Sequence, residues 1–212
     1  MSILTNFPLG DPRSWISLFS LVFLLGIAVC QVFARERMAK LIRPAMWFSI
    51  AVVFGLCMYL SYEVYLAWKS SAIGQYTLPP HQPISYFFGY VSFRIFAEYA
   101  ASFVAALGLV ALLKKLNVRY GGHFFEDDEM HAAALGAFLT GWPSLMVYVA
   151  VVLCGGVLGS LVRAVQARLR KQEEPDRFPL YYIWIPAAVI VLLSRTWLMD
   201  SSFWVLGFAR TF

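Results

Sequence analysis

Long apolar runs constrain this chain more than any other feature of its sequence. They cover about residues 15–34, 45–67, 84–113, 131–162 and 179–199. A helix needs about 20 apolar residues to cross the hydrocarbon core of a bilayer. Because 60% of the 212 residues are hydrophobic and only 14% are charged, a water-soluble fold would leave too much apolar surface uncovered. The sequence therefore predicts an all-α, polytopic membrane helix bundle, with residues 1–212 forming a single integral membrane domain.

The run over residues 131–162 is too long for one crossing. As a single helix it would measure about 48 Å at 1.5 Å per residue, against a hydrocarbon core of about 30 Å. It contains Gly141-Trp142-Pro143, a triplet typical of a tight turn at a membrane surface, because glycine ends helices, proline interrupts them and tryptophan favours the headgroup zone. We therefore predict about six transmembrane helices, the fourth being short and joined to the fifth by this hairpin.

Basic residues predict the sidedness of the bundle, since Lys and Arg accumulate in cytoplasmic loops. Twelve of the 17 lie in three loops: Arg35, Arg37, Lys40 and Arg43; Lys114, Lys115 and Arg119; Arg163, Arg168, Arg170, Lys171 and Arg177. The second and third loops can share one side only if the chain between them crosses an even number of times, as the predicted hairpin allows. We expect a multi-pass plasma-membrane protein with both termini outside and an external loop over residues 69–83. The first span should be retained, because residues 1–13 lack the basic start of a cleaved signal peptide.

Charge and cysteine patterns argue against several other classes of protein. The net charge is +5, but the basic residues form no stripe interleaved with aromatics, so we expect the lipid bilayer and not nucleic acid as a partner. Cys30, Cys57 and Cys154 lie inside apolar runs without CxxC spacing, which is typical of packing residues and not of disulfides or zinc ligands. We predict no cofactor.

The densest polar feature is an acidic cluster of four consecutive residues, Glu126, Asp127, Asp128 and Glu129. One interpretation is that Asp127 or Asp128 caps the short fourth helix and Glu129 occupies its first turn, where the helix dipole favours negative charge. A cation site is a second, although contiguous carboxylates diverge and no metal-ligand spacing is matched. A third is acid–base catalysis, in which one ionised and one protonated carboxyl activate water. Glu36 is the acid predicted to share the cytoplasmic face with this cluster.

A second charged feature lies inside the third apolar run. Arg94 and Glu98 are one helical turn apart, so they are predicted to neutralise each other as a structural ion pair. A role in polarising a substrate is the alternative. Transport through these two residues is a further hypothesis, but the sequence lacks the internal repeat typical of many transporters.

The stretch from Asp128 to Trp142 resembles a motif of a known family. It reads DEMHAAALGAFLTGW, with Gly136 eight residues after Asp128. The second catalytic aspartate of type IV prepilin peptidases lies in a motif that reads roughly GxGDxKLLAALGAWLGW. The glycine-containing span, the basic loop and the Pro175–Pro179 turn that follow are also similar, so the resemblance covers about residues 114–198. The chain departs from the motif at Phe125 and Asp127, where the family has glycines, and at Met130, where it has lysine.

This resemblance implies a GxGD-type membrane aspartic endopeptidase that cleaves the leader peptides of pilin-like proteins on the cytoplasmic side. It implies that Asp128 is catalytic, with Asp127 as the alternative if the register shifts by one. Glu36 is the candidate partner, because it lies eight residues before Pro44 where the family's first aspartate precedes an Ile/Leu-Pro pair by about seven. Glu126 and Glu129 are expected to help recognise basic residues that precede the cleavage site.

A diverged or inactive peptidase is compatible with the same residues. A non-catalytic scaffold of a pilus or secretion assembly is the alternative from a different functional class. In that case the acidic cluster would be a helix start and a docking surface only.

Overall fold

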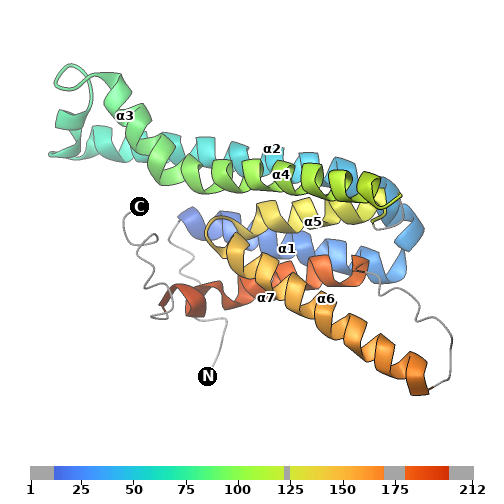
Figure 1. The fold of residues 1–212 in the computed structure, drawn as a ribbon. Coiled ribbons are helices and arrows are strands. Elements are labelled where there is room, and N and C mark those ends of the chain that lie inside the picture. The colour runs from blue at the N-terminus through green and yellow to red at the C-terminus, as the bar shows by residue number, and fades with distance from the viewer. Residues whose placement is uncertain (1–11, 122–124, 170–179, 201–212) are drawn as a thin grey trace.

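The chain folds into a bundle of α-helices (Figure 1). The computed structural model describes residues 12–121, 125–169 and 180–200. Its elements are α1 (Pro12–Phe33), α2 (Arg35–Ser70), the 3-10 turn η2 (Gly74–Thr77), α3 (Ile84–Val91), the π-helical turn η3 (Ser92–Phe96), α4 (Ala97–Arg119), α5 (Asp127–Thr140), α6 (Ser144–Leu169) and α7 (Tyr181–Asp200). Over the described residues the predicted all-α fold is confirmed.

Four helices in the described part of the chain are long and apolar enough to cross a membrane. They cover Ser14–Phe33, Met38–Ser70, Ile84–Arg119 and Ser144–Leu169. The third runs without interruption through α3, η3 and α4. The apolar part of α7, Tyr181–Arg195, is shorter, and α5 has 14 residues. The chain therefore has the helices of a membrane protein, while the count of six crossings stays a prediction.

The helix over the long apolar run is interrupted at the Gly141-Trp142-Pro143 triplet. Helix α5 ends at Thr140 and α6 begins at Ser144. Between them Gly141 has φ +72°, a left-handed conformation that glycine adopts at little cost. A Cβ at this position would also lie 2.7 Å from the Oε1 atom of Glu98. Both the backbone and the close approach of Glu98 require glycine here.

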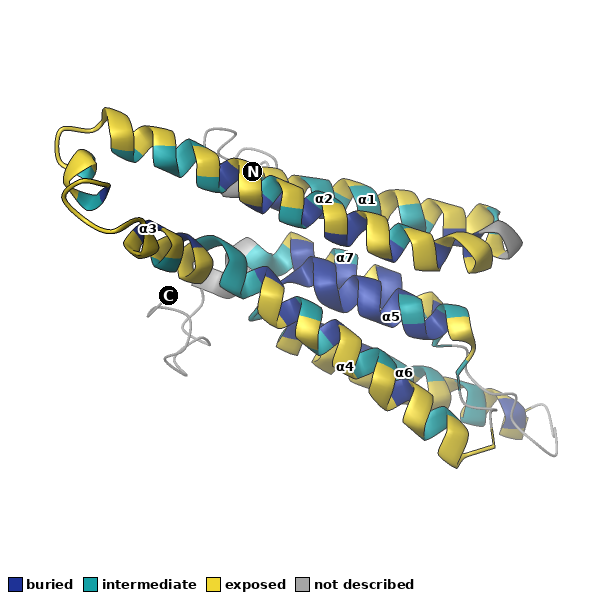
Figure 2. Cartoon of the chain, turned by 90° about the horizontal axis from the view of Figure 1, so that it is seen from above, coloured by how far each residue is buried: buried dark blue, intermediate teal, exposed yellow. Residues whose placement is uncertain are grey.

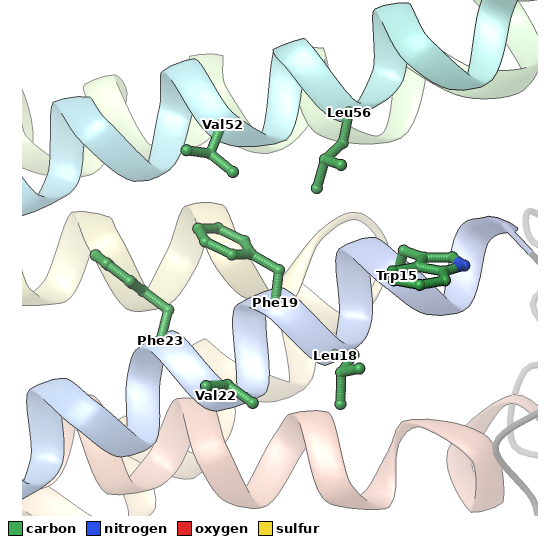
Figure 3. Close-up of a pocket in the computed structure, with 7 residues that line it drawn as sticks. All are labelled: Trp15, Leu18, Phe19, Val22, Phe23, Val52 and Leu56. Carbon is green, nitrogen blue, oxygen red and sulfur yellow. The ribbon is translucent and has the colours of Figure 1, made fainter. Parts of the chain in front are cut away.

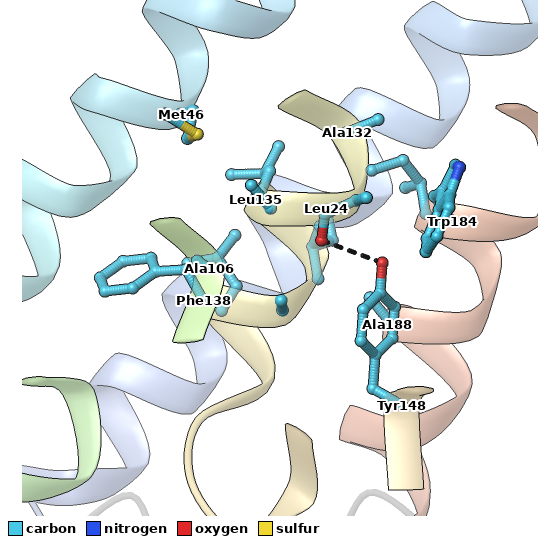
Figure 4. Close-up of a cluster of buried hydrophobic side chains, with 14 of the residues drawn as sticks. Leu24, Met46, Ala106, Ala132, Leu135, Phe138, Tyr148, Trp184 and Ala188 are labelled. Atoms are coloured by element: carbon cyan, nitrogen blue, oxygen red, sulfur yellow. Dashed lines mark hydrogen bonds between the residues drawn. The ribbon is translucent and has the colours of Figure 1, made fainter. Parts of the chain in front are cut away.

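Helix α5 lies at the centre of the bundle. It contacts α1, α2, α4, α6 and α7, and 11 of its 14 residues are buried, which makes it the dark segment in Figure 2. Its alanines and Gly136 allow the surrounding helices to approach closely. A Cβ on Gly136 would lie 2.6 Å from the hydroxyl oxygen of Tyr148, and that hydroxyl donates to the Ala133 carbonyl at 3.1 Å (Figure 4). The centre of this fold is therefore a short, small-residue helix wrapped by longer ones.

The antiparallel arrangement brings the ends of α1, α4 and α6 and the starts of α2, α5 and α7 toward one end of the bundle (Figure 1). The described residues of the three basic groups lie toward this end, which we call the basic end. Its assignment to the cytoplasm stays a prediction.

Candidate functional site

The start of α5 presents the acidic cluster at the basic end. Glu126 is the N-cap, with an extended backbone, and its N–H donates to the Oε2 atom of Glu129 at 3.3 Å. The Glu129 N–H donates to Asp128 Oδ1 at 3.1 Å. The acidic cluster therefore starts and caps α5, as the first interpretation predicted, and Glu129 lies in the first turn. The cap itself is Glu126, and the prediction that Asp127 or Asp128 would occupy it was wrong.

Asn117 explains where the helix starts. From the last turns of α4, its Nδ2 donates to the carbonyl of Phe125 at 2.9 Å, and its Oδ1 accepts the Phe125 N–H at 3.1 Å. Both polar backbone groups of Phe125 are thus bound to a side chain, so that residue is held outside the helix. The helix then begins one residue after Glu126, earlier than the aspartates alone would indicate.

Glu129 joins three helices. Its carboxylate is buried, with 6% of the residue exposed, and Oε1 accepts the Tyr181 N–H of α7 at 2.9 Å. The carbonyl of Tyr181 in turn accepts a hydrogen bond from the Gln31 side chain of α1 at 2.5 Å. A buried carboxylate is tolerated when it is hydrogen-bonded in this way. These bonds give Glu129 a structural role, and its part in recognising a substrate stays a prediction.

Arg35 brings the start of α2 to the same place. Its Nη2 atom lies 3.9 Å from Glu126 Oε2, and its guanidinium carbon lies 5.5 Å and 6.0 Å from the ring centres of Tyr181 and Tyr182. An exposed ion pair of this kind contributes at most about 1 kcal/mol to stability. It is informative here because it shows that the start of α2 lies near the start of α5. The next residue is Glu36, whose side chain lies outside the described part of the structure. Its backbone belongs to the first turn of α2, directly after Arg35.

The two candidate aspartates differ in their surroundings. Asp127 is exposed, and its carbonyl lies 2.6 Å from His131 Nδ1. Asp128 is half-buried. The neighbouring Tyr181 has a buried hydroxyl with no hydrogen-bond partner in the described part of the chain. Of the two aspartates, Asp128 is the more enclosed.

Several residues at this site had no place in the sequence-based hypotheses. Gln31 offered one signal, because it is an amide inside the first apolar run. The roles of Arg35, Asn117 and Tyr181 depend on contacts between helices and had no comparable local signal. The Pro175–Pro179 turn of the family resemblance lies outside the described residues.

A separate charged pair closes the far end of α5. Arg195 of α7 forms an ion pair with Glu98 of α4, and both side chains are partly buried. The pair lies against the Gly141 turn. Sequence reasoning missed Arg195 as a partner, and the predicted pairing of Glu98 with Arg94 stays a prediction. Since 14 helical residues span about 21 Å, this pair is distinct from the acidic cluster.

An apolar groove opens between α1 and α2 (Figure 3). Its volume is about 410 Å³, and its lining consists of Trp15, Leu18, Phe19, Val22, Phe23, Val52 and Leu56. No lining side chain carries a charge or a hydroxyl, so the groove offers no acid–base chemistry. Among the described residues no group of three or more His, Cys, Asp or Glu side chains could hold a metal ion.

No protein-family model, curated protein or solved structure matches this chain.

Proposed function

We propose that this protein is a membrane aspartic endopeptidase of the prepilin-peptidase type that removes leader peptides from pilin-like proteins. One observation supports the proposal: Arg35 of α2 contacts Glu126 at the start of α5, so the first turns of α2 and α5, which contain Glu36 and Asp128, lie at the same end of the bundle. These are the two acids that the resemblance implies. The proposal also places the active site on the cytoplasmic side of the plasma membrane, with both chain termini outside.

The proposed chemistry is hydrolysis with two carboxyl groups. Asp128, at a helix N-terminus that favours negative charge, accepts a proton from water as the water oxygen bonds to the scissile carbonyl carbon. Glu36 then donates a proton to the leaving nitrogen as the carbon–nitrogen bond breaks. The ionised and protonated roles of the two acids are exchanged at the end of the cycle.

Substrate recognition is assigned to the exposed part of the acidic cluster. Glu126 and Asp127 are exposed at the basic end, and we assign to their two carboxylates the attraction of basic residues in a leader peptide. Glu129, which is buried, supports them by fixing α5 against α7. The apolar helix that follows a pilin leader would remain in the bilayer beside the bundle.

Co-expression with the pilin-like proteins encoded in the same genome tests this function. We expect leader removal by the wild type, its loss in Asp128→Asn and Glu36→Gln, and its retention in Glu63→Gln. Glu63 is a matched control because it is also a glutamate of α2 but lies 27 residues further along the helix. Leader processing that survives both Asp128→Asn and Asp127→Asn would refute the peptidase.

Impermeant maleimide tests the proposed sidedness. Single cysteines at Val118, near the basic end, and at Ser70, at the other end of α2, are introduced after replacing the three native cysteines. We expect Val118→Cys to react only from the cytoplasmic side and Ser70→Cys only from outside. The reverse pattern would contradict the proposed orientation.

A non-catalytic scaffold is the second candidate, favoured by the clamped backbone of Phe125. The family motif has a flexible glycine at this position, whereas here a bulky side chain packs against the core. A scaffold predicts that Asp128→Asn leaves pilus or secretion assembly intact. Glu126→Lys would then disrupt co-purification of an assembly partner.

A further inference from the structure

The two longest helical segments are much longer than a bilayer is thick. Met38–Ser70 has 33 residues and Ile84–Arg119 has 36, which correspond to about 50 Å and 54 Å, against a core of about 30 Å. We take the hydrocarbon core to begin after Arg43 in the first segment and, for the antiparallel second segment, before Lys114. About 20 helical residues cross the core, so each segment reaches the opposite boundary about 20 residues from these positions. The residues found there are Glu63 and Arg94. The chain between these two charges therefore lies beyond the hydrocarbon core.

We call residues 65–93 the aromatic hairpin. It contains the end of α2, η2, α3 and the start of η3, and it projects past the other helices in Figure 1. Its 29 residues include eight aromatic side chains and a single charged one, Lys69. A segment surrounded by water would carry about one charged residue in four. Tyrosine and tryptophan are instead enriched where a membrane meets water.

Internal packing uses only part of this aromatic surface. Leu78, Phe87 and Val91 form a small buried cluster. The Phe87 ring makes edge contacts with Tyr65 at 5.6 Å and with Trp68 at 5.5 Å between ring centres. This cluster holds α3 against the end of α2. Trp68 also contacts the rings of Tyr86 and Tyr90, at 6.3 Å and 4.9 Å between ring centres. These two tyrosines nevertheless keep 53% and 40% of their surface exposed.

The uncovered side chains lie on more than one face of α3. At about 100° per residue, Phe87 and Val91 define the stripe that faces α2. Exposed apolar residues flank both sides of it: Ile84 and Phe88 on one, Tyr86 and Tyr90 on the other. Ile73, near the tip, is 82% exposed. A protein partner covers one face of a helix, whereas a lipid layer surrounds all of them.

We propose that the aromatic hairpin is embedded in the phospholipid headgroup layer on the membrane face opposite the basic end. Its aromatic rings contact headgroups and the upper parts of acyl chains, and Lys69 reaches lipid phosphate or water. The hairpin anchors α2 and α3–α4 at a fixed depth. This role is independent of the proposed peptidase activity.

Spin labels along one helix test the depth of the hairpin. The protein, with its three native cysteines replaced by alanine, is labelled at Phe88→Cys, Tyr90→Cys, Val104→Cys or Val118→Cys and placed in phosphatidylcholine nanodiscs. All four side chains are exposed on the structure. Collision with oxygen reports hydrocarbon, and collision with a water-soluble nickel chelate reports water.

We expect the nickel chelate to collide severalfold less often with the labels at Phe88 and Tyr90 than with the label at Val118. We expect oxygen to collide less often with these two labels than with the label at Val104. The two hairpin labels should agree with each other, since both sides of α3 face lipid. Nickel collisions at both positions equal to those at Val118 would overturn the proposal. An interfacial value at one position and an aqueous value at the other would also overturn it.

Fluorescence provides a second measurement without labels in the hairpin. The Trp68 signal is the difference between the wild type and Trp68→Phe in vesicles of brominated phosphatidylcholine. Bromine placed high on the acyl chain should quench this signal more strongly than bromine placed deep. A Trp68 signal that neither lipid quenches would count against the proposal.

Discussion

Substitution of Gly136 by alanine should destabilise the protein, because the centre of the bundle has no room for one more methyl group. A Cβ there would lie 2.6 Å from the Tyr148 hydroxyl oxygen and 2.8 Å from its ring carbon Cζ. Tyr148 is fully buried, hydrogen-bonded to Ala133 and next to Trp184, so it has no space to retreat. Overpacking of this kind costs about 1–3 kcal/mol. Alanine regains about 0.5–1 kcal/mol in a helix, which leaves a net loss of about 0–2.5 kcal/mol, with a central value of about 1 kcal/mol.

Cys57 provides the assay for this substitution. It is buried, so a thiol-reactive dye reports its exposure when the protein unfolds on heating in detergent. Cys30 and Cys154, which are exposed, are replaced by alanine beforehand. A loss of about 1 kcal/mol lowers the midpoint of a domain of this size by about 2–4 °C.

Two controls decide whether the steric reasoning holds. Gly108→Ala, in α4, places its Cβ where no atom lies within 4 Å, so its midpoint should equal or slightly exceed that of the wild type. In a Tyr148→Phe background Gly136→Ala should cost less, because the nearest atom has been removed. If Gly136→Ala is as stable as Gly108→Ala, or if Tyr148→Phe leaves its cost unchanged, the reasoning is refuted.

Three further predictions concern the two ends of α5. Glu98→Gln and Arg195→Gln should each lower the free energy of unfolding by about 1–3 kcal/mol, because each leaves a partly buried charge without its partner. The double variant should be more stable than either single variant. Losses that add up in the double variant would contradict the pairing. Gly141→Ala should lower the same unfolding midpoint, since a residue with a Cβ pays about 1–3 kcal/mol for the backbone conformation at this turn. An unchanged midpoint would contradict the predicted strain. Glu129→Ala should leave the Tyr181 N–H without its acceptor and lower the free energy of unfolding by about 1–3 kcal/mol. Hydrogen exchange of the Tyr181 amide should become faster. Unchanged exchange would show that this hydrogen bond does not protect the amide.

Local signals were enough to predict much of the fold. The described residues of the apolar runs are almost entirely helical, and the long run over residues 131–162 is divided into two helices at the Gly141–Pro143 triplet, as predicted. Such features depend on a few adjacent residues, whose conformational preferences do not require knowledge of the rest of the chain. The capping role of the acidic cluster is of the same kind. Its start was displaced by one residue because Asn117, from another helix, holds Phe125.

Contacts between distant helices could not be predicted in the same way. Glu98 and Arg195 are 97 residues apart, and Glu129 and Tyr181 are 52 apart. In a soluble protein the polar face of each helix would indicate its rotation. In a membrane bundle both the lipid-facing and the buried faces are apolar, so the sequence leaves the rotation of each helix undetermined. Arg35 and Gln31 therefore gave no indication of which helices they would join.

The shortness of α5 also has a consequence for how the protein is made. Helix α5 has only 14 residues, is rich in alanine and begins with acidic residues. Since about 20 apolar residues are needed to cross a bilayer, we expect it to insert poorly by itself. Its peptide groups are sheltered by five surrounding helices, most of which must already be in place. We therefore expect α5 to reach its final position by packing between helices that are already inserted, and the acidic cluster to reach its final position in the same step.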